Sequence, residues 1–228
     1  MSPEVLVRGT AVHAALAFLF DNPAKHGASA KAVVERFSAD AKSRGLDERW
    51  IKRGSDHLAQ YHARYAGAWH TDVLTEVPVR AMLDERLPGR GIRIGGKLDK
   101  IELFLRGEAN VVDYKTGVPK SRNDIEGKTK SSDGGYKRQL VFYKLLLDLV
   151  PMPVHGLKEP IRMMSGEIDF VEPGKNGKFK KERFVISDAE TNDLREQINA
   201  IADDIVSMKF LENGCGERRC EYCALHGE

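Results

Sequence analysis

The order of apolar patterns in this 228-residue chain predicts an α/β fold, with a central mixed β-sheet flanked by helices. Three helical patterns come first and extended runs follow; a helix, further extended runs and a last helix complete the order. The length is enough for one domain with a sizeable core. We expect this domain to span residues 1–214 and a cysteine-rich tail to span residues 215–228.

The helical patterns have 3.6-residue periodicity and recognisable ends. We expect the first helices over residues 7–20, 28–41 and 47–68, the third capped by Asp47. His13 lies at the edge of the apolar stripe of the first helix. Taken alone, such a histidine is more often an ordinary core or surface residue than a ligand.

The second half of the chain alternates in the same way. A helix is expected over Tyr136–Val150, a strand near residues 156–164, and a hairpin of residues 167–171 and 179–186. Ser187 or Asp188 should cap a last helix over residues 189–209. Its predicted inner face carries Leu194, Ile198, Ile201, Ile205 and Met208.

Two extended runs, residues 91–105 and 110–116, hold the most informative polar residues. Strand side chains repeat every two residues, so Asp99 shares a face with apolar neighbours, and Asp113 shares a face with Lys115. A hairpin centred near Gly107 would place Asp99 opposite Lys115 and diagonal to Asp113. Two carboxylates and an ammonium would then converge on one half-buried surface.

Such a convergence has two interpretations. Two carboxylates at about 4 Å repel by roughly 4 kcal/mol at an effective dielectric near 20, so they favour a bound cation. Carboxylate oxygens suit Mg²⁺ or Mn²⁺, and a lysine beside the ion could stabilise a developing anion. The other interpretation is a solvated hairpin with an ordinary ion pair.

Three motifs together resemble a known family. Gly95–Asp99, Val111–Gly117 and Gln139–Tyr143 are similar to the G-x-x-D, D-Y-K-T-G and Q-x-x-x-Y motifs of the PD-(D/E)XK nuclease superfamily, in particular its RecB-like branch. The resemblance extends from about Arg8 to about Gly214. It implies a restriction-endonuclease-like core and metal-dependent hydrolysis of DNA phosphodiester bonds.

The resemblance also implies roles for individual residues. Arg8–His13 resembles the G-x-x-x-H helix that supplies a third metal ligand, so His13 would join Asp99, Asp113 and the backbone carbonyl of Tyr114 around Mg²⁺ or Mn²⁺. Lys115 would help to activate water. The two α-helical residues of the last motif would contact substrate or brace the lysine: Gln139 and Tyr143. Glu76 resembles a glutamate often found near this site, although an exposed strand glutamate is the commoner case.

The segment between residues 118 and 138 is polar and biased toward basic residues. Its three glycines predict flexibility, and it leads directly out of the run that holds Asp113 and Lys115. It could follow a phosphate backbone, or it could be a solvated linker. The basic residues are Lys120, Arg122, Lys128, Lys130, Lys137 and Arg138.

The tail holds all three cysteines of the chain, and no cysteine precedes Cys215. Cys215, Cys220, Cys223 and His226 have the chemistry of a Cys3His zinc site. The cysteines could also be three ligands of an iron–sulfur cluster, as in some RecB-like nucleases, or bind no metal.

Composition limits the remaining choices. The formal charge of +2 means that any nucleic-acid surface is a local patch. We see no apolar run of membrane-spanning length and no signal peptide, so we expect a cytoplasmic, nucleoid-associated protein without a membrane partner. By resemblance, the partners are single-stranded or frayed DNA and a helicase domain or subunit, in recombination and repair. The alternative is a DNA-binding clamp that keeps the fold without cutting.

Overall fold

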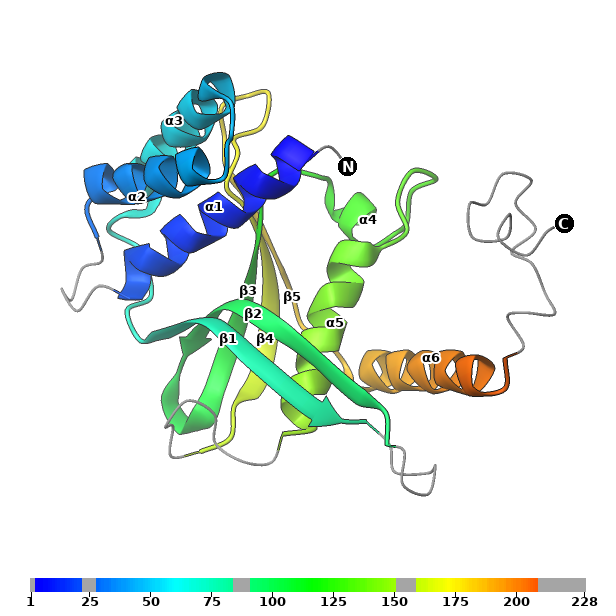
Figure 1. Cartoon of the computed structure of the whole chain (residues 1–228). Helices are drawn as coiled ribbons and strands as arrows, with labels where there is room; N and C mark the ends of the chain where they lie inside the picture. The colour runs from blue at the N-terminus through cyan, green and yellow to red at the C-terminus, as the bar shows by residue number, and fades with distance from the viewer. Residues whose placement is uncertain (1–2, 22–27, 84–90, 151–158, 209–228) are drawn as a thin grey trace, which may run out of the picture.

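The computed structural model describes residues 3–21, 28–83, 91–150 and 159–208, which form a five-stranded mixed sheet with helices packed against it (Figure 1). This confirms the predicted α/β class. The strand order is β1-β2-β3-β4-β5; only the β3–β4 pair is parallel. The strands are β1 (Val73–Met82), β2 (Arg93–Leu103), β3 (Glu108–Lys115), β4 (Arg162–Phe170) and β5 (Lys180–Phe184).

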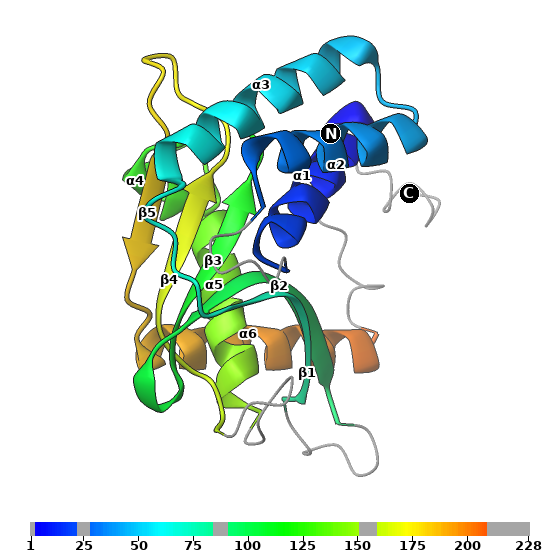
Figure 2. The same ribbon diagram turned by 90° about the vertical axis from the view of Figure 1, so that its left-hand side faces the viewer.

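Two apolar cores lie against the sheet. On one face, α5 packs over β1–β4; on the other, three N-terminal helices enclose a second core that includes Val112 and Tyr114 of β3 (Figure 2). β3 is therefore buried on both faces, as expected for a central strand with a parallel neighbour. The helices are α1 (Pro3–Asp21), α2 (Ala30–Ser43), α3 (Glu48–Tyr65), α4 (Arg122–Ile125), α5 (Gly135–Asp148) and α6 (Asp188–Val206), with a 3-10 turn at Leu105–Gly107.

Side-chain caps fix where the helices begin. Asp47 accepts from the backbone N–H of Arg49, which confirms the predicted cap of α3. Ser187 and Glu190 form a capping box at the start of α6. Gly54 allows α3 to approach α2 closely, because a Cβ there would lie 2.3 Å from Phe37 Cζ.

The predicted hairpin exists, but its register differs from the expectation. Lys100 pairs with Val112 and Leu103 with Ala109, so the hairpin is centred on residue 106 instead of 107. Arg106 and Gly107 take positive φ values of 61° and 70° to make the turn. Continuing this register places Asp99 opposite Asp113, where the expectation placed Lys115. The shift is two residues along one strand, so the shared face is preserved.

Two later predictions were also wrong in detail. A single strand, β4, replaces the separate runs expected at residues 156–164 and 167–171, of which residues 156–158 lie outside the described residues. In α6, Leu194 is buried and Ile198 packs against the core, but Ile201, Ile205 and Met208 are each about 60% exposed. The helix projects beyond α5 after its first turns, so its later apolar residues meet no described partner (Figure 1).

The basic segment that follows β3 was predicted to be flexible because of its glycines, but local hydrogen bonds hold it. A capping box of Ser121 and Asp124 starts α4, and Ser132 donates to the Asp124 carbonyl. Four of the six basic residues of the segment 118–138 form ion pairs: Arg122 with Glu182, Lys128 with Glu126 and, in the first turn of α5, Lys137 with Glu190 and Arg138 with Asp133.

Among the described residues, α1 alone is long and apolar enough to cross a membrane, which the sequence reading had not expected. Its apolar side is occupied within the fold. Ala11, Ala15, Leu16 and Leu19 are at most 1% exposed and pack in the core shared with α2 and α3. The apolar character of α1 is thus explained by core packing.

Candidate active site

The predicted carboxylates lie where two strands separate. Pairing between β2 and β3 ends at Lys100 and Val112, and the next residues along the register, Asp99 and Asp113, face a cleft. Asp99 is 7% exposed and Asp113 is 1% exposed. The cleft has a volume of about 1150 Å³ and is bounded by α1, the strands and α5.

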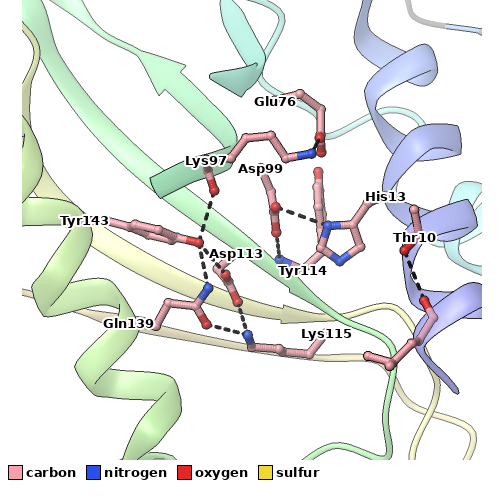
Figure 3. A network of polar contacts seen from close by, with 11 residues as sticks. Thr10, His13, Glu76, Lys97, Asp99, Asp113, Tyr114, Lys115, Gln139 and Tyr143 are labelled. Carbon is pink, nitrogen blue, oxygen red and sulfur yellow. Dashed lines mark hydrogen bonds and ion pairs between the residues drawn. The ribbon is translucent and has the colours of Figure 1, made fainter. Parts of the chain in front are cut away.

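Three ligand-type side chains from three elements meet in this cleft (Figure 3). His13 of α1, Glu76 of β1 and Asp99 of β2 each offer one ligand atom, and these atoms lie within 4.8 Å of one another. His13 Nδ1 lies 3.1 Å from Asp99 Oδ1, and Asp99 Oδ2 accepts from the backbone N–H of Tyr114 at 2.9 Å. The second bond fixes the orientation of the Asp99 carboxylate.

Glu76 reaches this set through an unusual backbone conformation. Its φ is 51°, in the left-handed region, and it is skipped in the pairing between Thr75↔Lys100 and Val77↔Leu98. A non-glycine residue in this region costs of order 1–3 kcal/mol, and such strain concentrates at functional sites. The conformation turns the Glu76 carboxylate toward the cleft, where it pairs with Lys97.

The donor set fits a divalent metal ion. One imidazole nitrogen and two carboxylate oxygens suit Mn²⁺ directly, and the carboxylates suit Mg²⁺. The side chains come from separate elements, so the fold itself holds them together. Asp113 lies beside them on β3, and the Tyr114 backbone borders the same cleft.

A chain of hydrogen bonds fixes the residues of the D-x-K and Q-x-x-x-Y motifs (Figure 3). Lys115 Nζ lies 2.6 Å from Asp113 Oδ2 and donates to Gln139 Oε1 at 2.7 Å. Gln139 Nε2 donates to the Tyr143 hydroxyl at 2.6 Å. That hydroxyl in turn donates to Asp113 Oδ1 at 3.1 Å. Gln139 therefore holds the lysine, and Tyr143 holds the Asp113 carboxylate.

Burial and charge change the acid–base properties of the site. Burial and nearby Asp99 raise the pKa of Asp113, although Lys115 opposes the shift. Burial alone would lower the pKa of His13, but its hydrogen bond and the negative charges of Asp99, Asp113 and Glu76 raise it overall. Burial and Asp113 raise the pKa of Tyr143, so its hydroxyl stays protonated as a donor.

A second buried ion pair secures α1 to the ends of β3 and β4. Arg8 is 6% exposed; its Nη2 donates to the Thr116 carbonyl at 2.5 Å and lies 2.5 Å from Glu172 Oε1. The adjacent Val171 N–H donates to the Lys115 carbonyl at 3.0 Å. Arg8 thus connects the helix that bears His13 to the strand end that bears Lys115.

The sequence reading identified most of these residues. The structure brings His13, Asp99, Asp113, Tyr114, Lys115, Gln139 and Tyr143 to one cleft. Glu76 joins them, one of the two interpretations that the sequence leaves open for it, and the sequence assigns no role to Lys97 or to the Arg8–Glu172 pair. Only Glu76 had a signal, its similarity to a family glutamate. Cys215, Cys220, Cys223 and His226 lie outside the described residues.

Comparison with known proteins places the chain in a superfamily. The sequence pattern of the PD-(D/E)XK nuclease superfamily matches residues 2–227, and the chain belongs to that superfamily. No curated protein matches the chain.

Two solved structures resemble the fold at low identity. One is named "Crystal structure of SSO0001" (13% identity, 91% of this chain and 78% of that chain, TM-score 0.40). The other is named as a "Putative exonuclease" from Eubacterium rectale (12% identity, 100% of this chain and 74% of that chain, TM-score 0.49).

Proposed function

We propose that this protein is a Mg²⁺- or Mn²⁺-dependent deoxyribonuclease of the RecB-like branch that hydrolyses phosphodiester bonds. The observation that carries the proposal is the meeting of His13, Glu76 and Asp99 beside the braced Asp113–Lys115 pair. Superfamily membership supports a nucleic-acid substrate.

The metal ligands in this proposal are His13, Glu76, Asp99 and Asp113, with the backbone carbonyl of Tyr114. A divalent ion held there would supply Lewis acidity to the phosphate and lower the pKa of water. The ion would also compensate the negative charge of the carboxylates that gather there, Glu76, Asp99 and Asp113.

Neighbouring side chains of the protein hold Lys115 and Asp113 in position. The Lys115 ammonium is held by Asp113 and Gln139 against the ring of Tyr136, 4.6 Å from its centroid. Its position is therefore set before substrate arrives, so that it can stabilise charge developing on the phosphate and orient the attacking water. Tyr143 stays a protonated donor and keeps Asp113 oriented.

The cellular setting that we propose is recombination and repair, with single-stranded or frayed DNA as substrate and a helicase domain or subunit as partner. It rests on the D-Y-K-T-G and Q-x-x-x-Y motifs of residues 113–117 and 139–143. We also propose that Cys215, Cys220, Cys223 and His226 hold zinc or that the cysteines hold an iron–sulfur cluster. The proposed location is cytoplasmic and nucleoid-associated.

The test is cleavage of fluorescent single-stranded DNA with different divalent ions. We expect cleavage with Mg²⁺ or Mn²⁺ and none with Ca²⁺, because Ca²⁺ prefers longer and looser coordination. Undiminished cleavage in excess chelator would refute the metal dependence. Binding of DNA without cleavage under every metal condition would favour the non-catalytic clamp.

A further inference from the structure

The cleft does not end at the acidic set. From His13 it continues across α1 to a wall built by α2 and α3. The residues of α1 that line this part of the cleft have small side chains, which leave space above the helix. They are Gly9, Thr10, Ala14 and Ala17. The wall itself consists of Arg36, Arg44, Trp50 and Arg53.

The three arginines present positive charge to the cleft. Arg36 is exposed and forms no ion pair with any described residue. Arg44 pairs with Asp40 at 2.7 Å and Arg53 with Glu172 at 3.0 Å, yet their side chains remain 43% and 51% exposed. A guanidinium carries five N–H donors, so one carboxylate leaves donors available to a phosphate.

An aromatic residue lies among these arginines. Trp50 is half-buried, with the Arg53 guanidinium 5.8 Å from its ring and Arg8 at 4.9 Å. Phe18 of α1 borders the same cleft. Positive charge interleaved with aromatic rings is typical of surfaces that bind single strands, because unpaired bases stack on aromatic and guanidinium planes.

The other basic surface near the site is less suited to this role. None of the six basic residues of the segment 118–138 is among the residues that line the cleft. From that segment, only Val118 and Tyr136 border the cleft. The earlier interpretation of residues 118–138 as the phosphate-tracking segment is therefore weaker than a path over α1.

We propose that a single DNA strand runs from the acidic set across α1 and lies against the α2–α3 wall of Arg36, Arg44, Trp50 and Arg53. The guanidinium groups contact backbone phosphates, and unpaired bases stack against the Trp50–Arg53 side. This inference rests on the proposed nuclease function. It adds the surface that holds the strand away from the bond being cut.

Helix α2 offers a matched pair of variants for the test. Arg36→Ala/Arg44→Ala removes two charges that border the cleft, whereas Lys31→Ala/Lys42→Ala removes two charges of the same helix that do not. All four positions are exposed, and alanine favours helix, so both variants should fold. Circular dichroism would check this.

Binding would be measured by fluorescence anisotropy of a short labelled oligothymidylate in chelator, so that no cleavage occurs. We expect the arginine variant to raise Kd about tenfold and to lower the salt dependence of log K by about 1.4, or two phosphate contacts. The lysine variant should change neither quantity. A blunt duplex of the same length should bind more weakly to the wild type.

Hydrolysis of a small chromogenic phosphodiester separates this inference from the proposed function. A small diester cannot reach the α2–α3 wall, so its hydrolysis by the wild type with Mn²⁺ reports on the acidic set alone. If the wild type binds the oligonucleotide but hydrolyses nothing, the nuclease proposal fails and the strand path survives. Equal Kd values for the two variants, or equal wild-type affinity for duplex and single strand, would overturn the path.

Discussion

Removing the ammonium of Lys115 tests the catalytic assignment most directly. Lys115 Nζ lies 2.6 Å from Asp113 and 2.7 Å from Gln139, and its side chain is 17% exposed. The charge is therefore fixed and partly shielded from water. A charge about 4 Å from a developing anion is worth roughly 4 kcal/mol at an effective dielectric near 20. In the Lys115→Ala variant, kcat should fall by about 10²–10⁴.

Metal binding should respond differently from the rate. Lys115 is not a ligand in the proposed site, so Mn²⁺ affinity in a calorimetric titration should survive the substitution. Asp113→Ala should lower both Mn²⁺ affinity and cleavage. The difference between these two variants distinguishes a catalytic ammonium from a side chain that only supports the ligands.

Lys120 provides the matched control. Its Nζ lies 4.4 Å from the centroid of the same Tyr136 ring that Lys115 contacts, so Lys120→Ala removes a nearby ammonium that does not touch Asp113. Its kcat should stay within about twofold of wild type, because an exposed charge that does not contact Asp113 contributes little. Cleavage at the wild-type rate by Lys115→Ala, or an equal loss in both variants, would refute the role of Lys115.

Three further predictions concern the metal ligands, the tail and the core. Glu76→Gln should weaken Mn²⁺ binding at least about tenfold by calorimetry while the fold is kept, because it removes one negative charge from the donor set. If the tail binds metal, purified protein should contain zinc or a visible chromophore, and Cys220→Ser should reduce it; metal-free protein of unchanged stability would contradict this. Burial raises the pKa of Asp169 despite Lys181 and Tyr61. Between the ordinary value of 3.8 and the raised pKa, the folded protein holds a proton that the unfolded chain has lost. The contribution of Asp169 to the unfolding free energy therefore falls as pH rises through this window, and Asp169→Asn should remove that part of the pH dependence in urea titrations.

Local chemistry explains which parts of the fold could be predicted from the sequence. Asp47 and Ser187 act within their own helices, so their caps were readable from neighbouring residues. The shared face of Asp113 and Lys115 follows from the two-residue repeat of a strand and was also predictable. The hairpin register was not, because residues 106 and 107 both take positive φ and the turn residues alone do not choose the centre.

Glu76 shows why the complete donor set was harder to predict. Its carboxylate reaches His13 and Asp99 only because the residue takes a left-handed conformation inside a strand. Tertiary contacts impose that conformation, and alternation along β1 carries no signal of it. The prediction that Ile201 and Ile205 of α6 are buried was wrong for a related reason. Periodicity identifies the apolar face of a helix, but it does not show where the packing partner of that face ends.

A comparison of buried carboxylates supports the choice of the cleft as the candidate active site. Asp169 on β4 is 0% exposed, but Lys181 Nζ lies 2.7 Å away and the Tyr61 hydroxyl donates at 2.5 Å, so fixed groups compensate its charge. At the cleft, the described residues paired with Glu76, Asp99 and Asp113 are two lysines, Lys97 and Lys115, and a titratable His13. The first arrangement offsets part of the cost of burying one carboxylate with groups of the fold itself, although the pKa of Asp169 remains above its ordinary value. The second leaves negative charge that a divalent cation would balance, in keeping with the proposed metal-dependent function.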